Sequence, residues 1–123
     1  MSSATPSLTQ AQRRRLRQRT AQLRRALASF DSLVSGTVYT RYRSCGKASC
    51  RCAVDPDARH GPYYQWSHRQ DGRAVHRIVT AEQAELLREA AANYHQAREL
   101  LGQWERETVA EIFAVQDTVA EPE

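Results

Sequence analysis

All three cysteines of this 123-residue chain lie within eight positions, in the stretch RYRSCGKASCRC at residues 41–52. Thiolates can form disulfides, carry redox chemistry or bind metal ions. An odd number of thiols fits a disulfide framework poorly, and the spacings Cys-x4-Cys and Cys-x-Cys differ from the Cys-x-x-Cys of redox motifs. Three thiolates and one imidazole suit a tetrahedral zinc site. We therefore predict that Cys45, Cys50 and Cys52 bind Zn²⁺.

A fourth ligand is needed, and the nearest histidine is His60, eight residues after Cys52 and expected in the same loop. The other histidines fall on predicted strands or a predicted helix: His68, His76 and His95. Four protein ligands leave no open position, so the zinc is expected to be structural. Two alternatives stay open: buried thiols that act as small apolar groups, and an open three-cysteine site without His60.

The ligands must be held by short β-elements. Residues 37–43 and 63–69 are rich in β-branched and aromatic side chains and predict two strands, and residues 74–79 predict a third. Asp71-Gly72 is a type I′ hairpin signal between the last two strands. We predict a three-stranded antiparallel sheet with a zinc knuckle at one end, a zinc-stapled β module over residues 37–79.

Helices are predicted on either side, which makes the fold class α+β. An amphipathic helix is expected over residues 8–34, from a three-four apolar spacing at Leu16, Thr20, Leu23, Leu27, Phe30 and Val34. A long helix over residues 80–117 begins at a capping box formed by Thr80 and Gln83. Residues 1–7 are expected to be a disordered lead-in, and residues 118–123 a tail. The two helices are expected to pair as an antiparallel coiled coil.

The predicted helices differ in length, about 38 Å against about 55 Å at 1.5 Å per residue. An apolar stripe from Trp104 to Val115 would then stay uncovered. This predicts a homodimer or a higher oligomer.

Charge is divided unevenly along the chain. Residues 1–79 hold 15 basic and 4 acidic residues, and residues 80–123 hold 3 basic and 10 acidic ones. This asymmetry favours either a face that binds polyanions or two halves that attract each other.

The first hypothesis is a nucleic-acid-binding module, for DNA rather than RNA. Its candidate contacts lie on or beside the sheet and the metal loop, interleaved with tyrosines: Arg41, Arg43, Lys47, Arg51, Arg59, Arg69, Arg73 and Arg77. Guanidinium groups fork onto phosphates or guanine edges, and a two-stranded ribbon can enter a groove. Arginines of the first helix, between Arg13 and Arg19, can contact the nucleic-acid backbone as well.

The alternative is a non-enzymatic oligomerisation or protein-interaction adaptor with a structural zinc site. In this hypothesis glutamates of the last helix neutralise the arginines of the first, and no nucleic acid is needed.

Other classes of function find little support. No catalytic constellation or phosphate-cradling glycine loop is present, so we expect no enzymatic activity. No apolar run approaches the ~20 residues of a membrane span, and no secretion signal follows Met1, which predicts a soluble cytoplasmic protein without membrane association.

The segments RYRSCGKASCRCA and HGPYY resemble the signature of a family of short bacterial and archaeal proteins with a domain of unknown function. The resemblance covers residues 41–79 by motif and the flanks by helical character. It implies Cys45, Cys50, Cys52 and His60 as ligands, and residues 61–64 as structural. Some members are described as transposase-related or lie near mobile elements, which implies a recombinase or transposase partner. The resemblance carries no established activity.

Overall fold

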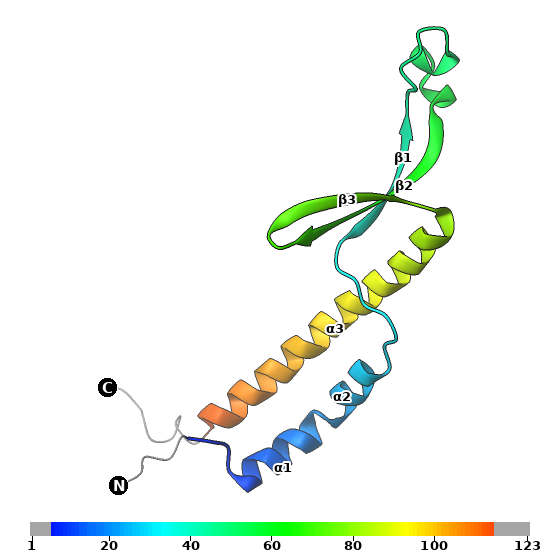
Figure 1. Ribbon diagram of the computed structural model, residues 1–123. Coiled ribbons are helices and arrows are strands. Elements are labelled where there is room, and N and C mark those ends of the chain that lie inside the picture. The colour runs from blue at the N-terminus through cyan, green and yellow to red at the C-terminus, as the bar shows by residue number, and fades with distance from the viewer. Residues whose placement is uncertain (1–5, 115–123) are drawn as a thin grey trace. The chain divides into compact units, whose positions relative to one another are not determined.

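The computed structural model describes residues 6–114 (Figure 1). The predicted lead-in falls mostly on residues 1–5, and the predicted tail wholly on residues 115–123, which lie outside the described part of the chain. The chain forms two compact units, one around the sheet at Ser32–Tyr94 and one made of the flanking helical segments. The long helix α3, Ala81–Phe113, contributes to both.

Two short helices replace the single helix predicted over residues 8–34: α1, Gln10–Arg19, and α2, Ala21–Ala28. Thr9 caps α1 through a capping box with Gln12. The helical regularity is interrupted at Thr20, whose buried hydroxyl donates to the carbonyl of Leu16 at 2.6 Å. A side chain that bonds to the preceding turn perturbs a helix at that point.

The predicted helix is also too long at its C-terminal end. Ser29 turns its amide and hydroxyl back onto the carbonyl of Ala26. Phe30 and Val34 continue the three-four spacing but lie beyond α2, and the amide of Val34 donates to the carbonyl of Ala90 in α3.

In the helical unit, α1 runs antiparallel to the C-terminal part of α3. The direction follows from the ion pairs, since Arg15 bonds Glu111 at 2.6 Å and Arg19 bonds both Glu111 and Glu107. Glu111 is only 4% exposed although it is charged. The two guanidinium groups therefore compensate a carboxylate that is largely removed from water. Heptad packing of a coiled coil stays a prediction.

The long helix begins as predicted. The Thr80 hydroxyl accepts from the Gln83 amide, and the Gln83 side chain accepts from the Thr80 amide, both at 3.0 Å. The helix is described as far as Phe113, and the predicted end at residue 117 lies outside the described part. No helix within residues 6–114 combines the length and apolarity that a membrane span needs.

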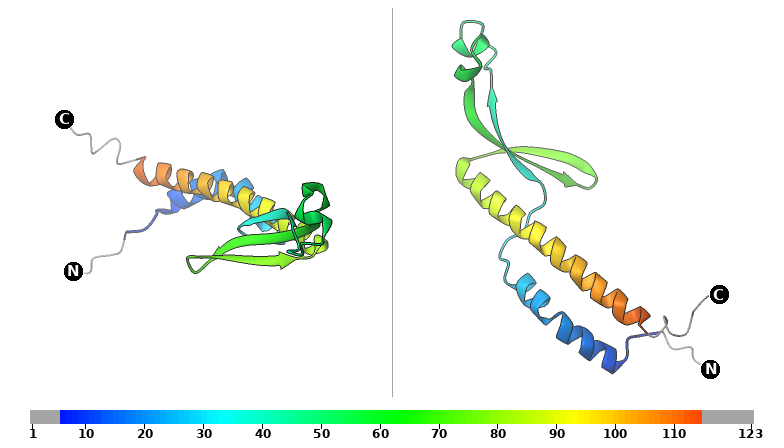
Figure 2. Two further views of the ribbon diagram at one scale, coloured as in Figure 1. Left: turned by 90° about the horizontal axis from the view of Figure 1, so that it is seen from above. Right: turned by 180° about the vertical axis from the view of Figure 1, so that it is seen from behind.

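The sheet has the order β1-β2-β3 and is antiparallel throughout. Its strands are β1, Thr37–Arg43, β2, His60–Gln70, and β3, Arg73–Val79. β1 pairs with β2 from His60 to Ser67, whereas β3 pairs with β2 from Tyr64 to Gln70. Only residues 64–67 of β2 thus have a strand on both sides. Beyond them β2 enters two separate two-stranded arms, visible in both views of Figure 2.

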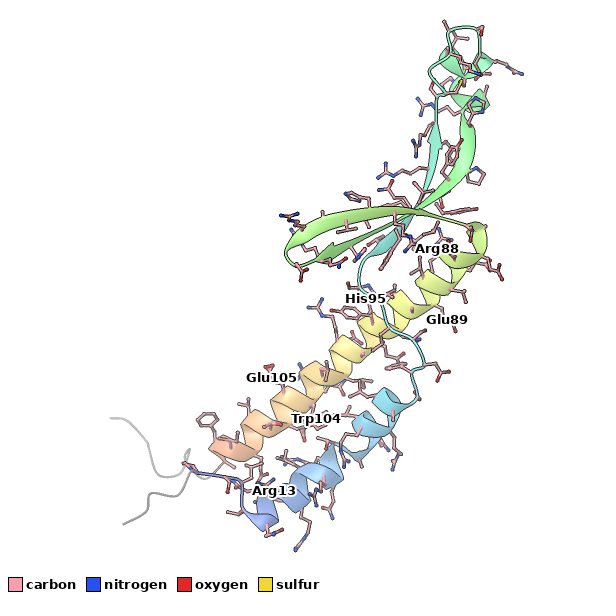
Figure 3. The ribbon with its side chains drawn as sticks, viewed as in Figure 1. Arg13, Arg88, Glu89, His95, Trp104 and Glu105 are labelled. Carbon is pink, nitrogen blue, oxygen red and sulfur yellow. The ribbon has the colours of Figure 1, made fainter. Side chains whose placement is uncertain are left out.

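The register gives the sheet two unlike faces. Tyr64 and Trp66 of β2 share one face with Thr40 and Val79, because residues directly opposite in a ladder point the same way. The first turns of α3 lie beside this inner face: Arg88 donates to the Thr40 hydroxyl at 3.1 Å and lies over the Tyr64 ring (Figure 3). The outer face carries the alternate positions of each strand.

Glycine is required at two turns. Asp71 and Gly72 both have positive φ, 53° and 80°, as a type I′ turn demands, so the predicted hairpin is confirmed. Gly36 enters β1 with φ of 100°, and a Cβ there would meet the Ser67 carbonyl oxygen at 2.2 Å. Because Gly36 lies this close to β2, the Trp66 indole can donate to the carbonyl of the preceding residue, Ser35, at 3.0 Å.

The Glu111 ion pairs predict a pH-dependent stability. Hydrogen bonding to Arg15 holds the pKa of Glu111 below its ordinary value of 4.5. A carboxyl whose pKa is lowered on folding stabilises the fold above its unfolded pKa, and this contribution is lost as pH falls through the folded pKa. Glu111→Gln should therefore lower the melting temperature by several degrees at pH 7, with a difference that shrinks below about pH 4.5.

Thermal unfolding followed by circular dichroism measures this effect. Glu105→Gln is the matched control, because Glu105 is an exposed glutamate of the same helix with no ion pair in the described part of the chain (Figure 3). Equal melting temperatures for the two variants at pH 7 would contradict a stabilising role for the buried carboxylate.

Candidate metal centre

The four predicted ligands lie at the end of the β1–β2 arm. Cys45 follows the last residue pair of this arm, Arg43 opposite His60, by two positions. Cys50 and Cys52 come from a compact loop that contains two 3₁₀ turns, Arg51–Ala53 and Pro56–Ala58. His60 is the first residue of β2, which corrects the expectation that it lies in the loop. One strand end, one turn and one strand start thus position the whole set.

Local hydrogen bonds shape the loop. The Cys50 amide donates to the Lys47 carbonyl, and the Ala53 amide donates to the Cys50 carbonyl. Asp55 caps the second 3₁₀ turn through the Asp57 amide and forms an ion pair with Arg51 at 3.4 Å. Gly46 supplies a positive φ of 84° between the first ligand and this turn. These bonds all lie within the loop, so residues 45 and 52 come together without contacts from distant parts of the chain.

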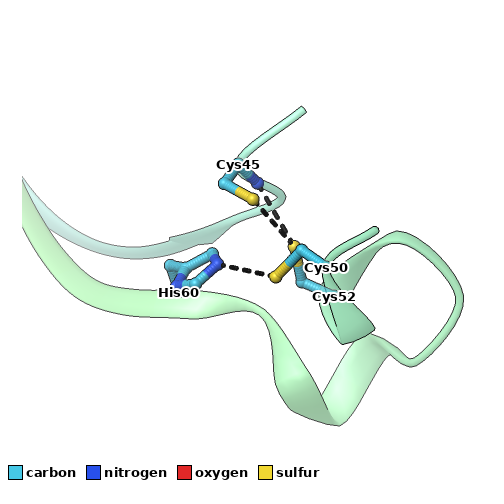
Figure 4. Close-up of side chains that lie close together, drawn as sticks. All are labelled: Cys45, Cys50, Cys52 and His60. Atoms are coloured by element: carbon cyan, nitrogen blue, oxygen red, sulfur yellow. Dashed lines mark hydrogen bonds between the residues drawn. The ribbon is translucent and has the colours of Figure 1, made fainter. Parts of the chain in front are cut away.

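The four ligand atoms all lie within 4.8 Å of one another (Figure 4). The sulfurs of Cys45 and Cys52 are 3.5 Å apart, and the sulfur of Cys50 is 3.3 Å from Nε2 of His60. Two ligands of a tetrahedral zinc ion with bonds of about 2.3 Å are separated by about 3.8 Å. The set therefore has the dimensions of a coordination shell, and its four residues could hold a metal ion.

The thiols differ in acidity. The pKa of Cys52 is lowered to about 6 because the Cys45 amide and then the Ser44 hydroxyl bond to its sulfur. The Cys52 amide also lowers the pKa of Cys50. The bonds of the Cys50 thiol to the Cys52 and Cys45 thiols, together with the burial of Cys50, outweigh this effect, so the pKa of Cys50 is raised. Neighbouring thiols resist losing more than one proton in the absence of a cation. A divalent ion supplies the charge that lets all three become thiolates.

The donor set excludes the alternative of buried thiols as core. Only Cys52 is buried, at 4% exposure, while Cys45 and His60 are exposed and Cys50 is half-buried. All three cysteines are free of disulfides. A convergent group of three sulfurs and an imidazole, largely at the surface, is a donor set that could hold a metal ion.

The remaining histidines are placed away from this cluster. His68 stacks on Trp66, with ring centroids 3.8 Å apart, and His76 bonds the Ser67 hydroxyl at 2.7 Å. His95 lies in α3.

Ser44 was missed by the sequence reasoning, since a serine beside a cysteine carries no signal by itself. Its hydroxyl, 3.6 Å from the Cys52 sulfur, is a polar neighbour of the cluster.

The predicted basic residues are divided between the two arms of the sheet. Arg41 and Arg43 lie on β1, and Lys47, Arg51 and Arg59 lie in the metal loop. Arg69 and Arg73 lie on the other arm, where Arg69 donates to the Gly72 carbonyl, and Arg77 lies opposite Trp66 in the three-stranded overlap, where it borders a groove. All eight are exposed, and of these eight only Arg51 has an ion pair with a described residue.

The family model for a domain of unknown function, DUF6788, matches residues 9–89, about two thirds of the chain. The chain belongs to this family. The DUF6788 match contains α1, α2, the metal loop and the whole sheet, and it extends beyond the motif-bearing residues 41–79. Searches of curated proteins and of solved structures found no match. The family description names no activity, and a link to mobile elements stays a prediction.

Removing a ligand should abolish metal binding. We expect the purified protein to hold about one Zn²⁺ per chain, and Cys52→Ser or His60→Ala to lose it, because the loss of one of four ligands weakens metal affinity. Metal content by mass spectrometry and the thiolate-to-metal absorption of a Co²⁺-substituted sample measure this. His76→Ala is the control and should keep its metal. A full complement of zinc in the His60 variant would overturn the assignment of that ligand.

Proposed function

We propose that this protein is a small nucleic-acid-binding protein, for DNA rather than RNA, whose β module is stabilised by structural Zn²⁺. One observation carries the proposal. The three strands hold five arginines and no acidic residue, while the arginines that do find carboxylates on α3 belong to the other unit. No arginine of the three strands has an ion pair among the described residues, which favours a positive surface on the sheet.

The metal loop extends this surface. Lys47 and Arg59 are exposed there and have no ion pair among the described residues, whereas Arg51 shares its charge with Asp55. A zinc ion would hold the loop at the end of a two-stranded ribbon, which is only marginally stable by itself. Zinc bound by four protein ligands has no open position, so its role here is to position the basic residues.

Salt dependence tests the electrostatic contribution. Binding to DNA at about 50 mM salt should weaken steeply as salt is raised, because each phosphate contact releases a counterion. The double variant Lys47→Gln/Arg59→Gln should weaken binding and reduce the slope of log K against log salt by about two. Fluorescence anisotropy measures both quantities. Arg98→Gln, which removes one exposed positive charge from α3, should leave the slope unchanged.

Two results would count against this proposal. One is the absence of binding to duplex or single-stranded DNA or RNA at about 50 mM salt. The other is a slope that falls by about one in the Arg98 variant, half the change of the double variant, because net charge alone would then account for the binding.

A second candidate function, an oligomerisation or protein-interaction adaptor, is favoured by the helical unit. Arg15 and Arg19 are paired with α3, so they need no nucleic acid to balance their charge. α3 also exposes apolar side chains near its described end: Leu101, Val109, Ile112 and Phe113. Trp104, by contrast, is half-buried and lines a groove with Leu16 and Thr20. Of the predicted stripe, Val115 lies outside the described residues.

This second candidate predicts a homodimer through α3. Ile112→Glu should then convert dimers into monomers, because a charged side chain opposes burial of the apolar face. Light scattering at micromolar concentration measures the mass. Leu86→Glu, which alters a more exposed leucine of the sheet unit, is the control. A wild-type protein that is monomeric would contradict the adaptor hypothesis in this form. The same candidate includes a recombinase or transposase as partner.

A further inference from the structure

Two tyrosines and two arginines follow one another along β1 and β2, and we call them the Tyr–Arg ladder: Tyr39, Arg41, Tyr63 and Arg43. Tyr39 is opposite Gln65 in the three-stranded overlap, Arg41 and Tyr63 continue the same outer face into the β1–β2 arm, and Arg43 lies beyond a register shift in β1. Arg41 lies directly opposite Tyr63 in the register, so Tyr39 and Tyr63 are diagonal neighbours on one face. The Arg41 guanidinium lies 5.4 Å from the Tyr39 ring centroid, and that of Arg43 lies 5.2 Å from the Tyr63 ring centroid. Both distances are typical of cation–π contacts.

The ladder tyrosines are not core residues. Tyr64 and Trp66 are half-buried on the inner face, beneath Arg88 and the apolar residues of α3. Tyr39 and Tyr63 are 44% and 39% exposed on the outer face, where Ile78 is exposed as well. Alternation along the strands therefore buries one set of aromatic rings and presents the other to solvent. Packing in a hydrophobic core therefore does not explain why aromatic residues stand beside arginines on the outer face.

We propose that the Tyr–Arg ladder binds single-stranded DNA: two bases displace the guanidinium groups that lie over the Tyr39 and Tyr63 rings and stack there, and Arg41 and Arg43 turn outward to pair with phosphates. This inference rests on the proposed nucleic-acid function. Charge complementarity supports the occupant, because the three strands contain no acidic residue and the ladder arginines have no carboxylate partner among the described residues. Aromatic rings that stack on bases, combined with cationic groups that follow the backbone, are the recurring elements of single-strand recognition.

The spacing of the two tyrosine positions favours a single strand over a duplex. The backbone positions of diagonal neighbours in an antiparallel sheet are about 7–8 Å apart. This is about twice the 3.4 Å rise of each nucleotide in duplex DNA. Two bases can therefore reach the two rings only if they are unstacked from each other. Bases inside a duplex present edges and not faces, so a duplex cannot use these rings.

The neighbouring polar groups bear on the choice between DNA and RNA. Recognition of a 2′-hydroxyl requires hydrogen-bonding groups that face the sugar. Two polar side chains on the outer face are bonded to a neighbour: Gln65 donates to the Ser67 hydroxyl at 3.3 Å, and Ser67 bonds His76 at 2.7 Å. The guanidinium groups beside the rings suit phosphates, which DNA and RNA share, and the RNA strand in the test below decides whether the sugar contributes.

The test uses the full-length zinc-loaded protein and a fluorescent DNA strand of about 12 nucleotides, within the site sizes of small single-strand-binding folds. The same sequence is supplied as a duplex and as RNA. We expect the single DNA strand to bind most tightly. Tyr39→Ala and Tyr63→Ala should each weaken its binding about tenfold or more. Tyr39→Phe and Tyr63→Phe keep the stacking ring and should bind like the wild type.

Tyr42→Ala is the matched control. Tyr42 is a more exposed tyrosine of the same strand, but it is outside the ladder. Its substitution should leave affinity unchanged. Photocrosslinking of a bromodeoxyuridine-containing strand to the wild-type protein, mapped by mass spectrometry, should label Tyr39 or Tyr63. This readout does not depend on how well the alanine variants fold.

The outcomes separate the ladder from the broader proposal. Failure of every probe to bind at about 50 mM salt would overturn nucleic-acid binding itself, and the ladder with it. Duplex binding as tight as single-strand binding, unchanged in both alanine variants but reduced by Lys47→Gln/Arg59→Gln, would overturn the ladder alone. Tighter binding of the RNA strand would overturn the choice of DNA. Crosslinks confined to Tyr42 or the helices would place the strand elsewhere and overturn the ladder.

Discussion

Residues 64–67 of β2 are the part of the sheet with hydrogen-bonded strands on both sides, and the architecture of the sheet unit depends on this short overlap. From it β2 leaves in two directions, each time with one partner only. A two-stranded ribbon buries little and is marginal in water, so each arm needs a closure of its own. One arm is closed by the positive-φ turn at Asp71 and Gly72, and the other by the convergence of three cysteines and His60. α3 packs against the inner face beside the overlap, and the outer face remains open.

The ligand cluster shows how little chain such a closure requires. His60 begins β2 opposite Arg43, the last residue of β1, and Cys45 follows Arg43 by two positions, so strand pairing keeps these two ligands near each other. Cys50 and Cys52 are then brought in by turns of a few residues, which cost little loop entropy. The Cys45 amide and the Ser44 hydroxyl stabilise one thiolate at Cys52, so the loop favours negative charge before any cation is added. Further deprotonation is opposed by the neighbouring thiols, and a divalent ion is the natural partner for the complete set.

These features explain what the sequence could predict. The ligand set and the hairpin were predictable because their signals are local: closely spaced cysteines, and an Asp-Gly pair between strands. Thr37–Arg43 was predicted with the observed bounds, because its β-branched and aromatic residues end where the loop begins. The interruption at Thr20 and the end of α2 at Ala28 were not predictable. Thr20 and Val34 both satisfy the apolar spacing, but a hydroxyl bonded to Leu16 and an amide bonded to Ala90 decide their conformations. Likewise, period-two alternation separates Tyr63 from Tyr64, yet only the register and α3 decide which ring is covered.

The arginines of the helical unit and those of the sheet differ in whether a carboxylate of the chain pairs with them. Arg15 and Arg19 lie on a helix antiparallel to an acidic one. Both pair with a carboxylate that is removed from water, so their charge stabilises the fold. The sheet arginines have no such opportunity, because none of the strands contains an acid and the loop contributes a single ion pair, Arg51 with Asp55. Arg41 and Arg43 instead lie over tyrosine rings, which orient a guanidinium without neutralising it. A cation held in place but left uncompensated retains its attraction for an anion from outside the molecule. The basic character of the chain therefore has two separate physical roles, and only the one expressed on the sheet is available for binding.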